Sequence, residues 1–315
     1  MRRLILTITT ICTLISFSIG QSPAITPVGT PRALTSTEYF LIAPKWSPDG
    51  TIIAATGNKY TGIYLIDFPS GDLINLTNDP TAGFGLEWSN KGNKIATRIS
   101  RFENIRRLNA IVFYDVNSGN MQLISDFSPD LYGIPKWTKD DRFIYLSNTD
   151  DFRIFSTTGE RVDKLNDFGK EKLVFIMKSR IVGRKVTSKI DSYINSPPGR
   201  IINLVISPDN TMIAYEVMGG HLWVSSIKGD NLVDLGVGHA PSWNPESDKI
   251  TYMITTDDGH NYLSSDIFVI NIDGSGKVNI TNNSETIAMH PNWSSDGKWI
   301  AFDSYNGQIF VQEVR

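Results

Sequence analysis

A short motif that recurs along the chain is the feature that most constrains its fold. In each copy an apolar anchor residue precedes a turn such as Ser-Pro-Asp-Gly, and a segment of alternating apolar and polar residues follows. The anchors are Trp46, Trp88, Trp137, Val205, Trp243 and Trp293. Most copies continue with a strand like "GIYLIDF", a glycine-containing turn and a closing strand like "LINLTND". Four short antiparallel strands in about 40 to 45 residues are typical of a β-propeller blade.

Six copies predict an all-β fold, a six-bladed β-propeller of four-stranded antiparallel blades that forms one domain over residues 31–315. A single four-stranded sheet cannot bury both of its faces, so the blades must pack against one another in a ring. The last copy supplies only three strands. Because Pro31–Thr35 matches the fourth strand of the other copies, we expect this N-terminal segment to complete the last blade.

The repeat resembles that of TolB-type β-propellers, a group with WD40-like repeats. The segments that carry the resemblance are "PKWSPDGTIIAATG" followed by "GIYLIDFPSGDLINLT", and "PNWSSDGKWIAFDS". The resemblance implies six blades over nearly all of the chain. TolB itself has an N-terminal α/β domain, whereas here only the leader residues 21–30 are expected before the propeller. Prolyl-oligopeptidase-type peptidases carry the same repeat, but this chain lacks the Gly-x-Ser-x-Gly motif of their hydrolase domain.

The first 20 residues have the features of a signal peptide. Arg2 and Arg3 form a basic region, and Leu4–Ile19 is an apolar stretch of suitable length. We expect cleavage before Gln21 and a periplasmic or extracellular location; an uncleaved anchor is the alternative. Cys12 lies inside this segment, so the mature chain would have no cysteine for a disulfide or a thiolate site. The net charge of −3 does not favour binding to nucleic acid.

The interval of 68 residues between the third and fourth anchors contains a stretch, residues 168–200, that the motif does not explain. It is either an inserted hairpin or a degenerate seventh blade, and its length, short of a full blade, favours the insertion. Glu171 and Asp191 are its only acidic residues. Its basic residues are Lys170, Lys172, Lys178, Arg180, Arg184, Lys185, Lys189 and Arg200. This charge suits an anionic polysaccharide, an acidic protein or a lipid headgroup, or it protects an exposed strand edge from aggregation.

Aspartates in the motif turns are the first candidates for a catalytic or metal site. Asp49, Asp209 and Asp296 occupy equivalent positions in three copies. They belong to different blades, so we do not expect their side chains to converge. Aspartate in such a turn commonly accepts hydrogen bonds from its own backbone, and we predict that role here.

The connections between strands predict where a ligand would bind. In a propeller, the loops between second and third strands and those between blades lie on one face, and two long loops belong to it: Ser100–Asn109 and Thr255–Ser265. Long loops on a rigid scaffold commonly carry binding residues. The candidates on these loops are Arg101, Arg106, Arg107, Asp257, Asp258, His260 and Tyr262.

Histidines supply a further candidate site at the end of the central channel. His239 and His290 precede two successive anchors and, with His260, could hold a metal ion. A propeller lyase that acts on pectin-derived oligosaccharides has channel histidines of this general kind; polar channel lining is the alternative. Asp257-Asp258-Gly259 is a weak candidate for a calcium loop, since it lacks the spaced ligands of an EF-hand.

These observations predict a monomeric, non-catalytic module without a cofactor that binds an envelope or extracellular protein, or an anionic polysaccharide. The alternative function is a metal-assisted carbohydrate lyase or hydrolase that uses the mouth of the channel.

Overall fold

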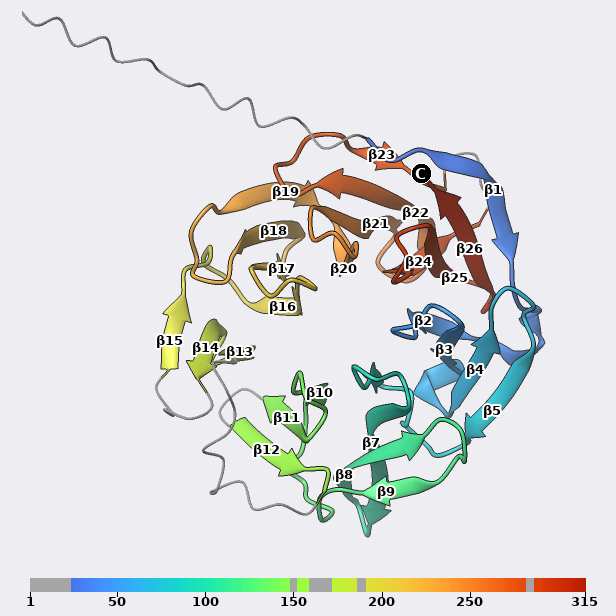
Figure 1. The fold of residues 1–315 in the computed structure, drawn as a ribbon, viewed down its shortest axis with the longest axis vertical. Coiled ribbons are helices and arrows are strands. Elements are labelled where there is room, and N and C mark those ends of the chain that lie inside the picture. Colours follow the sequence, from blue (N-terminus) through green and yellow to red (C-terminus); the bar gives the residue numbers. More distant parts are fainter. Residues whose placement is uncertain (1–23, 148–151, 159–171, 186–190, 282–285) are drawn as a thin grey trace, which may run out of the picture.

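A computed structural model describes residues 24–147, 152–158, 172–185, 191–281 and 286–315. These residues form seven antiparallel β-sheets arranged as blades around a central axis (Figure 1). The predicted signal peptide, residues 1–20, lies outside the described residues. In the described ranges, no helix is both long enough and apolar enough to cross a membrane.

The seven blades follow one another in chain order, and their strands run from the axis outward (Figure 1). The first blade contains β2 (Ile42–Trp46), β3 (Ile52–Thr56), β4 (Ile63–Asp67) and β5 (Leu73–Thr77). The second contains β6 (Glu87–Trp88), β7 (Lys94–Glu103), β8 (Arg106–Asp115) and β9 (Met121–Leu123). The third contains β10 (Lys136–Trp137), β11 (Phe143–Ser147) and β12 (Phe152–Ser156). The fourth contains β13 (Lys172–Met177), β14 (Arg180–Lys185) and β15 (Asp191–Ile194).

The last three blades have four strands each. The fifth contains β16 (Ile201–Ile206), β17 (Met212–Val217), β18 (His221–Ser226) and β19 (Val233–Val237). The sixth contains β20 (His239–Trp243), β21 (Lys249–Asp257), β22 (Tyr262–Asn271) and β23 (Val278–Asn279). The seventh contains β24 (Ala288–Trp293), β25 (Trp299–Ser304), β26 (Ile309–Val314) and β1 (Pro27–Ala33). Two single-turn 3₁₀ helices, η1 (Thr37–Tyr39) and η2 (Asn58–Tyr60), lie in loops.

The prediction of six blades is wrong, because residues that we expected to be an insertion form a blade of their own. Both faces of the sheet β13–β14–β15 are buried. Val174 and Ile181 pack with Tyr215 of the fifth blade, while Phe175 and Val182 pack with Tyr145 of the third. An inserted hairpin would not be covered on both sides. The predicted basic surface is also reduced by an ion pair, since Arg184 Nε lies 2.5 Å from Asp191 Oδ1.

The ring is closed by an N-terminal strand, as expected. Strand β1 pairs antiparallel with β26, and Arg32 lies opposite Val311. The first and last described strands therefore lie side by side in the seventh blade, with β1 outermost (Figure 1). The strand begins at Pro27, inside the segment that we expected to be a flexible leader. Thr26 and Arg315 extend the pairing with two backbone hydrogen bonds of 2.8 and 3.0 Å.

The anchor tryptophans connect neighbouring blades. The indole Nε1 of Trp88 donates to the carbonyl of Lys45, and Trp137 Nε1 donates to the carbonyl of Glu87, each at 3.0 Å. Trp243 repeats the bond with the carbonyl of Val205 at 3.3 Å. Each acceptor belongs to the innermost strand of the preceding blade. These three anchors therefore tie successive innermost strands together, whereas Trp293 Nε1 donates to the carbonyl of Gly297 in its own turn.

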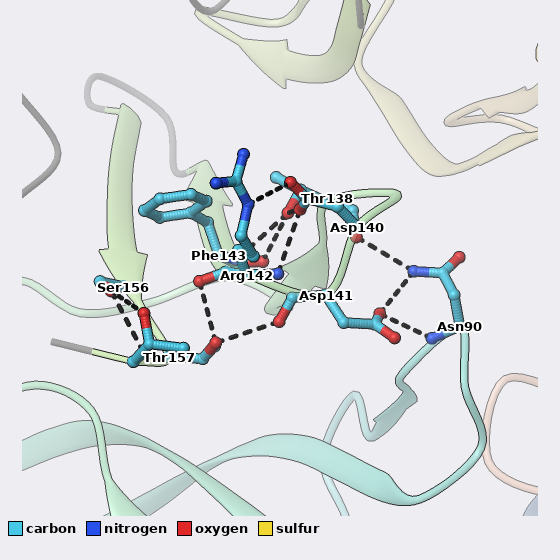
Figure 2. A network of polar contacts seen from close by, with 9 residues as sticks. Asn90, Thr138, Asp140, Asp141, Arg142, Phe143, Ser156 and Thr157 are labelled. Carbon is cyan, nitrogen blue, oxygen red and sulfur yellow. Dashed lines mark hydrogen bonds and ion pairs between the residues drawn. The ribbon is translucent and has the colours of Figure 1, made fainter. Parts of the chain in front are cut away.

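The motif aspartates have the predicted structural role. Asp49 Oδ1 accepts hydrogen bonds from Ser47 Oγ at 2.6 Å and from the backbone N–H of Thr51 at 3.1 Å. In the fifth blade the backbone N–H of Thr211 donates to Asp209 Oδ1, and in the seventh blade the backbone N–H of Lys298 donates to Asp296 Oδ1. Figure 2 shows the turn of the third blade, where Asp141 accepts hydrogen bonds from both the backbone N–H and the side-chain amide of Asn90 in the second blade. The motif aspartates thus bond within their own turns, and the Asn90–Asp141 contact ties the second blade to the third.

Candidate functional site

The face of the ring that carries the connections between second and third strands and between blades is here called the hairpin face. Two hairpins extend beyond the other strands on it: β7–β8 in the second blade and β21–β22 in the sixth. Their strands have nine or ten residues, against five or six in β3, β4, β17 and β18. The two long loops predicted from the sequence are thus continuous strand pairs. Arg101 pairs with Leu108, and Thr256 pairs with Ser264.

The β7–β8 hairpin carries the three predicted arginines on its outer half. Arg107 donates through Nε and Nη2 to Ser100 Oγ at 3.0 and 2.9 Å. Arg101 Nη2 lies 2.6 Å from Glu103 Oε1, and both of these side chains are about half exposed. Arg106 is exposed and pairs through its backbone with Glu103. Arg107 therefore has a defined orientation, whereas the Arg101 pair is a solvated contact of small energetic value.

The β21–β22 hairpin carries the four other predicted loop residues. Asp257 Oδ1 accepts from the N–H of Gly259 at 2.9 Å, and Asp258 Oδ1 accepts from the N–H groups of His260 and Asn261. These backbone bonds hold the pKa of Asp258 below its usual value. The carboxylates therefore shape the turn. His260 and Tyr262 are exposed beside it, and the second blade with its arginines is separated from this sixth blade by two others.

Large apolar side chains are concentrated on the hairpin face. They lie in loops between blades or in connections between second and third strands. The exposed ones are Tyr39, Phe40, Tyr60, Phe84, Phe102, Ile105, Tyr132, Ile134, Met218, Tyr262, Leu263 and Tyr305. Ile105 at the tip of β7–β8 is 97% exposed and Phe102 is 70% exposed. On the opposite face, the described short turns of the motif carry one such side chain, Leu232. Single exposed apolar residues are ordinary, but their accumulation on one face indicates an interaction surface.

A ring of side chains lies on the second strands of the blades, near the hairpin face. Its members are ten residues after each tryptophan anchor and, in the fifth blade, ten residues after Ile206, which pairs with Ile213 as Trp46 pairs with Ile53. Its described members are Thr56, Arg98, Ser147, Glu216, Met253 and Asp303. With Val205 as the predicted anchor, the fifth copy is displaced by one residue, so the spacing in the sequence does not place Glu216 in this ring. Glu216 and Asp303 determine how the two predicted channel histidines are held.

Glu216 is a buried carboxylate that joins the fifth blade to the sixth. Its Oε1 accepts from Asn203 Nδ2 and from the N–H of Ala240, both at 2.7 Å, and its Oε2 lies 3.1 Å from His239 Nδ1. Burial raises the pKa of Glu216, but the hydrogen bonds from His239, Asn203 and Ala240 outweigh it and lower the pKa. The hydrogen bond with Glu216 in turn raises the pKa of His239.

Asp303 plays the corresponding part between the seventh blade and the first. Its Oδ1 accepts from the N–H of Ala43 at 3.1 Å and lies 2.9 Å from His290 Nδ1. Asp303 is fully buried, and burial raises its pKa despite the nearby imidazole. Burial lowers the pKa of His290, but the charge of Asp303 and the hydrogen bond with it together outweigh burial and raise the pKa. The pair therefore binds a proton more tightly than its separate groups would.

The structure does not assemble the predicted three-histidine metal site. His239 and His290 each face a different carboxylate, while His260 lies at the end of the β21–β22 hairpin. Among the residues that the structure describes, no group of three or more His, Cys, Asp or Glu side chains has a metal-binding arrangement.

Comparisons with known proteins identify the fold. No protein-family model matches the sequence, and no curated protein matches it either. A putative TolB from Agrobacterium tumefaciens superposes with a TM-score of 0.55 at 17% identity, over 90% of this chain and 92% of that one. The Cps50 (Swd1) β-propeller domain from Myceliophteria thermophila gives 0.62 at 9% identity, over 92% and 100%. A chain of a mitotic checkpoint complex gives 0.60 at 14% identity, over 99% and 98%. The resemblance to TolB-type and WD40-like propellers is thus confirmed for the fold.

Proposed function

We propose that the protein is a non-catalytic binding module that docks a polypeptide partner on its hairpin face. The observation that carries this proposal is the concentration of exposed aromatic and aliphatic side chains there, opposite a face of short polar turns. Aromatic residues and arginine are enriched at the centres of protein interfaces, where they supply most of the binding energy. Phe102, Ile105, Tyr262 and Leu263 are the most prominent candidates, since they lie on the two extended hairpins.

Site-specific photo-crosslinking in the native host tests this proposal. A photoreactive amino acid replaces Ile105 or Leu263 on the hairpin face. In matched controls it replaces Leu232 on the opposite face or Met121 on the outer strand β9, both of which are exposed. We expect the same adduct from both hairpin positions and none from the controls. Adducts of equal yield at all four positions, or at the controls alone, would contradict the proposed face.

The partner is expected in the periplasm or outside the cell, because the N-terminal sequence has the features of a signal peptide. N-terminal sequencing of protein from the envelope or secreted fraction should give a chain that begins at Gln21. A protein that retained Met1 and fractionated with the membrane would instead support the uncleaved anchor.

The enzymatic alternative rests on the two histidine–carboxylate pairs at the axis. A histidine whose pKa is raised by a carboxylate can act as a general acid or base. In this structure, however, both carboxylates also hold backbone N–H groups of the next blade, which explains their burial without catalysis. An oligosaccharide-cleavage assay should therefore show no activity. Cleavage that disappears in both His239→Ala and His290→Ala would favour the enzyme.

A further inference from the structure

The guanidinium of Arg98 has no countercharge among the described residues, although it is almost completely buried. Arg98 lies on β7 in the ring of residues at the hairpin face and is 8% exposed. Its Nη1 donates to the carbonyl of Gly133 at 3.3 Å, and its buried Nε has no acceptor. In the described part of the chain, no carboxylate forms an ion pair with it. Glu87, on the innermost strand of the same blade, is held by Lys45 and Lys136.

A second cation adds to the positive potential at this position. Arg107 on the neighbouring strand β8 is near enough that its charge, together with burial, lowers the pKa of Arg98. Arg107 itself donates to the hydroxyl of Ser100, a neutral acceptor. A buried cation whose contacts are only a carbonyl and a ring is costly, since desolvation is not offset by an opposite charge. The two guanidinium groups therefore favour an anion beside β7.

Aromatic rings border this position. The guanidinium carbon of Arg98 lies 5.1 Å from the centre of the Phe84 ring, and Tyr60 contacts Phe84 edge-to-face at 5.2 Å. Phe84 and Tyr60 are partly exposed, as is Tyr132 next to Gly133. An anion that binds here would thus be attached to an apolar group, because a fully hydrated ion would gain nothing from the rings.

We propose that Arg98 and Arg107 form a subsite for a carboxylate that lies next to an aromatic or aliphatic side chain in a partner polypeptide. The inference rests on the proposed function and specifies its ligand chemistry. The planar guanidinium presents parallel N–H groups that match the two oxygens of a carboxylate. The carboxylate supplies the countercharge that Arg98 lacks, and the adjoining side chain covers Phe84 and Tyr60.

A fragment titration tests the subsite. The probes are N-acetyl-phenylalanine, which joins a carboxylate to a ring, its uncharged primary amide, and acetate. Binding is followed by NMR through the side-chain Nε–H signal of Arg98, which is assigned by its loss in Arg98→Met. We expect a Kd of about 1 mM for the acid and one at least about tenfold weaker for the amide and for acetate.

The variants separate binding from folding. Arg98→Met should weaken the binding of the acid by about tenfold or more, as followed on backbone NMR signals. Arg98→Lys should retain part of the affinity. Arg180→Met is the matched control, since Arg180 also lies over a ring, that of Tyr193 at 5.0 Å, but in the fourth blade. Ligand-free Arg98→Met should melt no lower than the wild type, because an uncompensated cation has been removed.

Each other outcome overturns the inference. Equal binding of acid and amide, unchanged binding by Arg98→Met, or no binding to the wild type would show that no carboxylate subsite exists. Acetate that binds as tightly as the acid would assign the site to a small free anion. The crosslinking at Ile105 and Leu263 is independent of these titrations, so the proposed docking face stands or fails separately.

Discussion

Removal of the Leu34 side chain should weaken the closure of the ring. Leu34 follows β1, is 8% exposed, and packs with Leu41, Trp46 and Val311 in the cluster between the seventh and first blades. Truncation of a buried leucine to alanine costs about 2 to 5 kcal/mol, and for a site at the edge of this cluster we expect about 3 kcal/mol. For a domain of this size, that corresponds to a decrease in Tm of roughly 6 °C.

The measurement is thermal and urea-induced unfolding of Leu34→Ala, followed by tryptophan fluorescence and by calorimetry. Ile74→Ala is the matched control, because Ile74 lies on the outer strand β5 and is 64% exposed. It should change the free energy of unfolding by less than about 0.5 kcal/mol. A Leu34→Ala protein that unfolds like the wild type, while Val311→Ala is strongly destabilised, would show that the N-terminal segment is not docked in solution.

The further predictions concern titration, buried hydroxyls and assembly. Glu216→Gln should lower the pKa of His239 in an NMR titration, because the hydrogen bond with the carboxylate raises it; an unchanged pKa would refute the pairing. Because the pKa of His239 is raised on folding, its protonated form stabilises the folded state, fully so below the unfolded pKa of about 6.5. The free energy of unfolding of the wild type should therefore exceed that of His239→Gln at low pH, and the difference should shrink as the pH rises through the folded pKa. Tyr215→Phe and Tyr252→Phe should melt at or above the wild type, since these buried hydroxyls have no acceptor among the described residues, whereas Tyr114→Phe should melt lower because it loses a bond to Asp79. Burial should also raise the pKa of Tyr215 and of Tyr252 to about 12 in a spectrophotometric titration. Sedimentation of the purified protein should give a monomer; a concentration-dependent dimer would contradict that expectation.

Much of the fold could be predicted from the sequence, because the repeated turn imposes the same local structure in six blades. Asp49 and Asp296 close their turns with the same bonds, so one motif indicates many strands. The sequence favours an insertion over a degenerate blade at the fourth position, because "KLVFIMK" and "RIVGRKV" contain neither the anchor nor its turn. It is held by apolar contacts on both sides of the sheet, and these depend on neighbours distant in sequence.

The candidate site was less predictable than the fold. The two hairpins can be predicted because their unusual length is visible in the sequence. The residues that their side chains contact cannot be predicted in this way. Arg98 and Glu216 each occur inside an apolar strand, where the sequence does not show whether a charged side chain is compensated. Only the ring places Glu216 against the next blade and leaves Arg98 without a carboxylate among the described residues.

The pairing of β1 with β26 also sets the order in which the blades can fold. The N–H of Ile309 donates to Thr35 Oγ1 across 274 positions of the chain, so this latch forms only after the final strands are present. In a chain that emerges N-terminus first, the residues around Thr35 remain unpaired until the strands of the later blades have been synthesised. The ring is therefore closed only when β26 is available to pair with β1.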